Sequence, residues 1–227
     1  MNDSLEIKEI NLREAFRYMG YKGGEINQGI LDLTDQCEKA LLKAIKPRMV
    51  YRVFDIMNTH EGVEVKNTPL IFRGKDIKAH LENCGRAILM CVTLSAEADR
   101  LIRSYEAESM EKAFITDTLA SAAVEQACEK AEEIIKKQVG DYSYTWRFSP
   151  GYGDFPLEVQ KDFLNVTEAA KRIGLNITDS LILIPRKSVT AVMGISEEPI
   201  PPKRRGCICC NMRDKCQYRK DGNHCGF

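Results

Sequence analysis

The chain has 227 residues, of which 44% are hydrophobic and 29% charged, and its 33 Lys and Arg balance 33 Asp and Glu. This is an ordinary globular composition, and the balanced charge argues against a dedicated nucleic-acid binder, which normally has a basic surplus. No stretch approaches the roughly 18 uninterrupted apolar residues of a membrane span, and the first residues lack the features of a secretory signal. We therefore expect a cytoplasmic protein with no nucleic-acid or membrane partner.

The first part of the chain is predicted to form two helices and then a hairpin. Apolar residues recur at helical spacing over 12–19 and again over 29–45, and Pro47 ends the second helix. Apolar and polar residues then alternate over 50–56, and the segment 63–72 is typical of a partner hairpin.

The central part is predicted to contain a buried strand and the longest helix. A short helix is expected over 76–81, and the apolar run 87–94 indicates a strand with both faces buried. Ser95 is expected to cap the helix that follows. The clearest helix covers 110–137, where mostly small apolar residues form one stripe, so another element is expected to pack closely against it.

The pattern after this helix alternates again between short elements. We expect a connection or short strand over 141–149, a helix over 157–173, and strands near 181–184 and 189–195. Interleaved helices and strands with hairpin-like spacings favour an α+β fold with a mainly antiparallel, twisted sheet and flanking helices.

The segment 147–156, Arg-Phe-Ser-Pro-Gly-Tyr-Gly-Asp-Phe-Pro, is the most distinctive part of the sequence. Two glycines bracket Tyr152, so the loop exposes its backbone and holds the tyrosine in place. Arg147 offers a planar fork for a carboxylate. On these residues alone, a structural turn with an exposed tyrosine is the simpler interpretation.

Together with the residues that follow, this loop resembles the reactivation domain of cobalamin-dependent methionine synthase. That family has an Arg-Pro-Ala-Pro-Gly-Tyr-Pro loop, then a helix, then Leu-Thr-Glu-Ser leading into Pro-Gly-Ala-Ser-Val-Ser-Gly. The matching residues here are 147–153, 177–180 and 185–191. The resemblance is firm over 147–195, looser over 10–137 and absent from the tail. It implies the fold of that domain over residues 1–196.

The resemblance also implies an S-adenosylmethionine site. Arg147 would hold the ligand's carboxylate, Tyr152 would stand near its methyl-bearing end as the catalytic position, and Glu125 would meet its polar end. From its helical position alone, Glu125 is a solvated glutamate. The residues expected to bind the ligand are Asn11, Glu125, Arg147, Ser149, Gly151 and Tyr152.

Three departures from the family pattern bear on this site. Asn11 replaces an aspartate, which removes a charge from the contact with the ligand's amino group. Gly153 replaces the proline after the tyrosine. Arg186 and Lys187 replace small residues, which suggests a different partner surface.

By the same resemblance, the protein would support reductive remethylation of inactive cob(II)alamin on a separate methionine synthase. The partner would supply the cobalamin, and flavodoxin or ferredoxin would supply the electron. Two other functions stay open: activation of another corrinoid methyltransferase, with a redox centre in the tail, and sensing of S-adenosylmethionine without corrinoid chemistry. A zinc-stabilised scaffold with a decayed ligand site is a further alternative.

Residues 197–227 are expected to form a proline-rich, basic linker and a cysteine-rich tail. The chain has nine cysteines; four lie in helical or apolar segments, where packing is expected, and the others crowd into the tail. The tail thiols could bind zinc or an iron–sulfur cluster, stay free or redox-active, or form disulfides. The metal-ligand set expected is Cys207, Cys210, Cys216 and Cys225.

Overall fold

The structure is a computed structural model that describes residues 5–21, 24–200, 214–215 and 220. Its helices are α1 (Leu12–Tyr18), α2 (Gln28–Ala44), α3 (Lys75–His80), α4 (Ala96–Glu108), α5 (Met110–Val139), α6 (Gln160–Thr167) and α7 (Ala169–Ile173), with a 3-10 turn at Leu157–Val159. Its strands are β1 (Arg48–Asn58), β2 (Val63–Val65), β3 (Ile71–Phe72), β4 (Arg86–Thr93), β5 (Ser143–Tyr144), β6 (Asn176–Ile177), β7 (Leu183–Ile184) and β8 (Ser188–Ser196).

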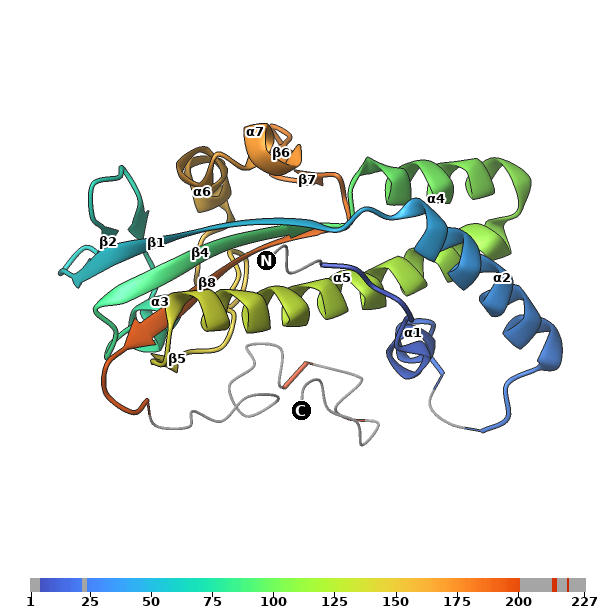
Figure 1. The fold of residues 1–227 in the computed structure, drawn as a ribbon, viewed down its shortest axis with the longest axis horizontal. Helices are drawn as coiled ribbons and strands as arrows, with labels where there is room; N and C mark the ends of the chain where they lie inside the picture. The colour runs from blue at the N-terminus through green and yellow to red at the C-terminus, as the bar shows by residue number, and fades with distance from the viewer. Residues whose placement is uncertain (1–4, 22–23, 201–213, 216–219, 221–227) are drawn as a thin grey trace.

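The main sheet is antiparallel throughout and has the strand order β3-β2-β1-β4-β8-β5. Its long strands β1, β4 and β8 twist across the molecule, and β6 and β7 form a separate pair (Figure 1). This architecture confirms the α+β fold with an antiparallel sheet and flanking helices that the sequence predicted. The expected strand near 181–184 is the short β7, which pairs with β6 and not with the main sheet.

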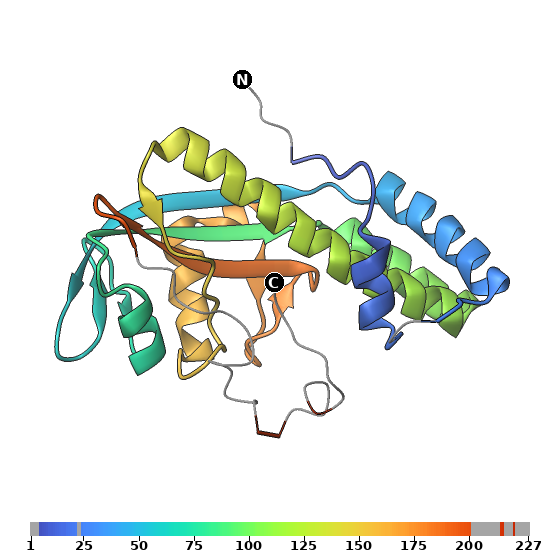
Figure 2. The same cartoon turned by 90° about the horizontal axis from the view of Figure 1, so that it is seen from below.

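Both faces of the sheet are covered by helices (Figures 1 and 2). Side chains of β4 alternate between the two sides because successive residues of a strand point in opposite directions. Ile88 and Met90 pack with α1, α2, α4 and α5, whereas Ala87 and Leu89 pack with α3, α6 and α7. All four are fully buried, which explains the uninterrupted apolar run of this strand.

The helix α5 lies along one face of the sheet (Figure 2). Its buried stripe contains Ala120, Ala123 and Ala127, whose small side chains let the helix approach the strands closely. Ser109 caps its start by accepting a hydrogen bond from the Lys112 amide, and Gly140, with φ of 119°, follows its end. The predicted helix over 110–137 is therefore confirmed, with one further half-turn.

Burial of Cys37, Cys84, Cys91 and Cys128 confirms that these four cysteines are packing residues. Burial raises the pKa of the Cys91 thiol to about 12, and burial also raises the pKa of the Cys128 thiol. Both thiols therefore stay protonated at neutral pH, as structural cysteines do.

Two sequence predictions about helices are wrong in detail. Ser95 occupies the position before α4 but does not cap it: its φ is 77°, and its hydroxyl accepts a hydrogen bond from the Lys46 amide at 3.2 Å. The helix predicted over 157–173 is broken at Glu168, whose left-handed φ of 55° separates α6 from α7. After the break, Ala169 and Ile173 of α7 are buried in the core on the side of the sheet that α3 and α6 cover.

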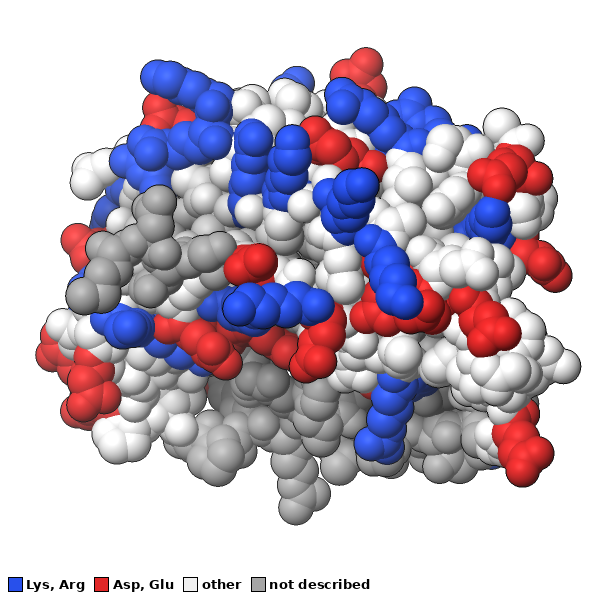
Figure 3. Space-filling model, turned by 45° about the vertical axis from the view of Figure 1, so that its right-hand side comes forward, with Lys and Arg blue, Asp and Glu red and all other residues white. Residues whose placement is uncertain are grey.

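Acidic and basic side chains are interspersed over the surface seen in Figure 3, as the balanced composition suggests. Within the ranges that the structure describes, no helix combines the length and the apolar character needed to cross a membrane.

Candidate functional site

The segment that leads into the glycine-tyrosine-glycine loop lies along the free side of β8. Tyr144 of β5 pairs with Ile195 of β8. Further along the segment, Phe148 and Val192 exchange two backbone hydrogen bonds of 2.9 Å. Between them the Thr145 hydroxyl accepts a hydrogen bond from the Gly194 amide at 2.7 Å. The backbone on both sides of Arg147 is thereby attached to β8, the long strand next to the edge of the sheet.

Because this segment is extended, Arg147 and Phe148 point to opposite sides of the sheet. Phe148 turns toward α3, where its ring centroid lies 5.0 Å from that of His80 and 6.1 Å from that of Phe155. Arg147 turns toward α5. The pairing of this segment with β8 therefore sets the side of the sheet on which the Arg147 guanidinium lies.

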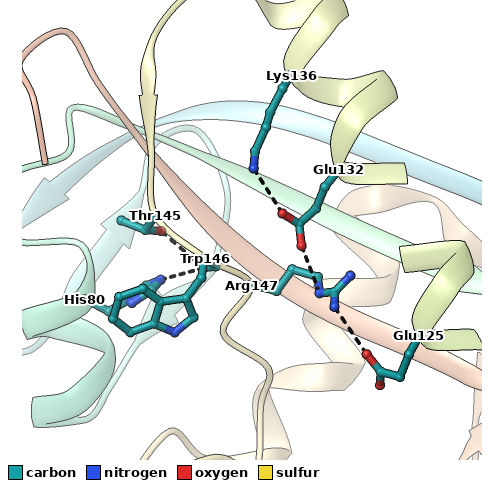
Figure 4. A network of polar contacts seen from close by, with 7 residues as sticks. All are labelled: His80, Glu125, Glu132, Lys136, Thr145, Trp146 and Arg147. Carbon is teal, nitrogen blue, oxygen red and sulfur yellow. Dashed lines mark hydrogen bonds and ion pairs between the residues drawn. The ribbon is translucent and has the colours of Figure 1, made fainter. Parts of the chain in front are cut away.

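The Arg147 guanidinium lies between two glutamates of α5 (Figure 4). Its Nε is 3.0 Å from Glu132 Oε1, and its Nη2 is 3.2 Å from Glu125 Oε2. Its third nitrogen, Nη1, is buried and has no hydrogen-bond partner among the described residues. A buried guanidinium nitrogen without a partner is costly unless an acceptor reaches it, so this atom indicates a place for one.

Glu125 and Glu132 are seven residues apart, which is two helical turns, so both lie on the face of α5 that Arg147 approaches. Glu132 also pairs with Lys136, whose Nζ is 3.1 Å from its second carboxylate oxygen. Partial burial raises the pKa of Glu125, the nearby carboxylates of Glu129 and Glu132 add to the rise, and Arg147 opposes it. The site thus holds more negative charge than Arg147 alone compensates.

The loop that follows exposes Tyr152, which is 68% exposed. Its backbone closes on itself through hydrogen bonds from the Tyr152 amide to the Ser149 carbonyl at 3.1 Å and from the Gly151 amide to the Phe155 carbonyl at 2.9 Å. Gly151 has a φ of 90°, which favours glycine. The tyrosine is therefore presented to solvent by a short, internally bonded turn.

This turn is attached to the start of α3 by two aspartates. The Asp154 carboxylate accepts hydrogen bonds from the amides of Lys75 at 2.7 Å and Asp76 at 3.0 Å, and the Asp76 carboxylate accepts one from the Asp154 amide at 3.3 Å. These backbone hydrogen bonds are the main reason that the pKa of Asp154 lies below its ordinary value.

The same contact explains why Gly153 stands where the family has proline. Its φ of 57° is closed to proline, whose ring holds φ near −65°. A Cβ at this position would also lie 2.1 Å from Asp76 Oδ2. The departure is required by the way this loop docks on α3.

Two further residues were expected to bind the ligand, Asn11 before α1 and Ser149 in the loop. Asn11 is the N-cap of α1: its Oδ1 accepts a hydrogen bond from the Glu14 amide at 3.2 Å, and its backbone N–H donates to Gln126 Oε1 at 2.8 Å. The Asn11 backbone is therefore attached to the residue that follows Glu125 on α5, and its side chain is already used as a cap. Ser149 is half-buried beside Phe148 on the loop.

The suggestion that Arg186 and Lys187 face a different partner is wrong for Lys187. Its side chain is only 12% exposed, and its Nζ lies 2.9 Å from Asp117 Oδ1 and 2.9 Å from Ser121 Oγ on α5. It connects the start of β8 to the helix. Arg186 has an exposed side chain, and its amide donates to Asp99 on α4 at 2.8 Å.

Two features that decide the site's geometry were not predicted from the sequence. Glu132 was not singled out, although its distance of seven residues from Glu125 could have indicated a shared helix face. The pairing of Asp76 with the loop has no local signal, because the two aspartates are 78 residues apart.

A pocket of about 650 Å³ lies elsewhere, between the end of α1, the start of α2 and the start of α5. Met19, Leu33 and Phe114 are among its lining residues, and none of the six expected ligand residues lines it. Its location along α5 is several turns away from Glu125. It is therefore separate from the candidate site.

The metal ligands expected in the tail, Cys207, Cys210, Cys216 and Cys225, lie outside the described residues, so this expectation stays a prediction. Among the residues that the structure does describe, no three His, Cys, Asp or Glu side chains are grouped so that they could hold a metal ion.

Comparison with solved structures identifies the fold. Neither a scan against protein-family models nor a search of curated proteins gives a match. A crystal structure of the MetH reactivation domain bound to AdoHcy, however, matches with a TM-score of 0.62 over 97% of this chain and 84% of that chain, at 16% sequence identity. The chain therefore has the fold of that domain, which confirms the fold that its motifs predicted.

Proposed function

We propose that this protein binds S-adenosylmethionine and supports reductive remethylation of cob(II)alamin on a separate methionine synthase. The observation that carries the proposal is the Arg147 guanidinium, which lies between two carboxylates with Nη1 buried and without a hydrogen-bond partner among the described residues. The ligand named with the solved structure of the same fold, AdoHcy, is an adenosyl amino acid.

The residues fit the charged end of such a ligand. An α-amino acid has a carboxylate and an ammonium group, and Arg147 and Glu125 offer the two opposite charges within 3.2 Å of each other. The fork of Arg147 suits a carboxylate because two parallel N–H groups can bind it at once. Tyr152, which is exposed, offers an aromatic face to the sulfonium cation.

Positioning is the contribution expected of these side chains. In reactions of this class the corrinoid supplies the reactive metal, and the protein holds the methyl donor in the right orientation. Arg147 would orient the amino-acid end, and Tyr152 would border the methyl-bearing end. The cobalamin-binding module of the partner and an electron donor such as flavodoxin or ferredoxin belong to the same proposal.

Calorimetric titration of S-adenosylmethionine and S-adenosylhomocysteine tests the binding step. Arg147→Ala is expected to lower the affinity for both ligands by about tenfold to a hundredfold, because a charge-assisted bidentate contact is lost. Arg172→Ala is the matched control, since Arg172 also pairs with a glutamate, Glu168 at 2.7 Å, but lies on α7 across the sheet. Equal affinities for the two variants would contradict the proposed site.

Methylation of cob(II)alamin then tests the function. With a corrinoid-loaded methionine synthase and a reduced flavodoxin or ferredoxin, the wild-type protein should increase formation of the methylated cofactor, and Arg147→Ala should not. Ligand binding without this effect on a methionine synthase or any other corrinoid protein would instead indicate a sensor of S-adenosylmethionine.

A further inference from the structure

The three guanidinium nitrogens of Arg147 differ in their hydrogen-bond partners. A guanidinium has a side edge, formed by Nε and Nη2, and an end edge, formed by Nη1 and Nη2, and a carboxylate can bind either edge through two hydrogen bonds. Glu132 contacts Nε on the side edge, whereas Glu125 contacts Nη2, which both edges share. Only Nη1 of the end edge has no partner among the described residues.

The two glutamates also differ in how firmly they are held. Glu132 is 18% exposed and uses both carboxylate oxygens, one for Arg147 Nε and the other for Lys136 Nζ. Glu125 is 49% exposed and makes one contact with Arg147, at the longer distance of 3.2 Å. A ligand can therefore displace Glu125 with little loss, but it cannot replace Glu132 without breaking a three-membered charge network.

We infer that Glu132 is a positioning residue that orients Arg147 through Nε, and that Glu125 is a displaceable occupant of Nη2. The inference rests on the proposed function. A ligand carboxylate takes the end edge, Nη1 and Nη2, and the released Glu125 carboxylate receives the ligand's ammonium group. One internal ion pair is exchanged for two pairs with the ligand, so the site selects molecules that have both charges on one carbon.

The consequence is that the two glutamates have different effects on ligand selectivity. Removing the charge of Glu132 leaves Arg147 misoriented, so recognition of the carboxylate is lost. Removing the charge of Glu125 leaves the end edge of Arg147 open, so the carboxylate is still bound and only recognition of the ammonium is lost.

The test compares Glu132→Gln, Glu125→Gln and Glu133→Gln in the full chain. Glu133 is the matched control, because it is exposed on the same helix directly after Glu132. The calorimetric probes are S-adenosylhomocysteine, its analogue without the carboxylate and its analogue without the amino group. The analogue without the carboxylate also reports whether each variant still folds and binds.

Glu132→Gln is expected to lower the affinity for S-adenosylhomocysteine about tenfold or more. Its affinity for the carboxylate-free analogue should change less than about twofold. Glu132→Asp should recover part of the lost affinity. Glu125→Gln is expected to bind the amino-free analogue more tightly than wild type does, because Arg147 has lost its competitor. If Glu132→Gln behaves like Glu133→Gln while Arg147→Ala abolishes binding, the inference is wrong and the proposed function stands. If wild type binds none of the three probes, the proposed function itself fails.

Discussion

The two sides of segment 147–156 are held by different kinds of interaction. On the α5 side, Arg147 is held by charged contacts that water partly reaches, with Glu125 half exposed. On the α3 side, Phe155 is buried against Phe72, with ring centroids 5.3 Å apart, and Asp154 binds backbone amides of α3. One side of the loop is thus fastened by close packing and the other by ion pairs that a ligand can rearrange.

Fold stability and ligand chemistry therefore depend on opposite sides of this loop. Buried rings and backbone hydrogen bonds fix the position of the loop, because their replacement leaves cavities or unpaired polar groups. Partly exposed ion pairs add little to stability and can change partners. Substitutions on the α3 side should therefore lower the free energy of unfolding, and substitutions on the α5 side should mainly alter ligand binding.

The largest effect is expected for Phe155→Ala. Removing a fully buried ring leaves a cavity beside Phe72 and Phe148, and the free energy of unfolding should fall by about 3–5 kcal/mol. Urea denaturation measures the loss. Tyr152→Ala, in the same loop but exposed, should change stability by less than about 0.5 kcal/mol. Similar losses for both variants would contradict the division between the two sides.

A smaller effect is expected for Gly153→Ala. Alanine would have to adopt a φ of 57° and place its Cβ 2.1 Å from Asp76 Oδ2, so either the Asp76 side chain or the loop must shift, and the hydrogen bond between them is disturbed. We expect a loss of about 2–3 kcal/mol in thermal or urea unfolding. Gly174→Ala isolates the backbone part, because Gly174 has a φ of 73° with nothing near its Cβ, and should lose about 1 kcal/mol. Equal losses would mean that contact with Asp76 is unimportant.

The smallest effect is expected for Asp154→Asn, and it depends on pH. The pKa of Asp154 is lowered below its ordinary value of 3.8 by hydrogen bonds from the α3 amides. Its ionised form therefore stabilises the fold above about pH 4, and this contribution is lost as the pH falls through the lower folded pKa. Because water screens this exposed group, the wild type should exceed the variant by no more than about 1 kcal/mol at pH 7.

Unfolding measured from pH 7 down to pH 2 should show the two proteins converging below about pH 4. Asp179→Asn, in the exposed turn between β6 and β7, is the control for the removal of a surface carboxylate. A stability difference between wild type and Asp154→Asn that grows toward acid pH would contradict the role assigned to this carboxylate.

Local patterns predicted much of this architecture from the sequence. Period-two alternation and an apolar run located β1 and β4, and the small-residue stripe of 110–137 located α5, because these signals depend only on which side of an element is buried. The break at Glu168 was missed, since its left-handed conformation is stabilised by the packing of α7 and not by the residue itself. The role of Ser95 was missed for a similar reason: its hydroxyl bonds to Lys46, far away in the sequence.

Residue types at short spacing were enough to predict the α+β fold class, the four buried cysteines and an exposed tyrosine in the loop 147–156. The sequence also drew attention to Arg147 and Glu125 through a resemblance. Three features depend on the packing of distant segments: Arg147 contacts two glutamates of α5, Glu132 is the second of them, and a Cβ at Gly153 would clash with Asp76. These contacts join segments between 15 and 77 residues apart, and such pairings depend on how the sheet and helices pack, which no local pattern encodes.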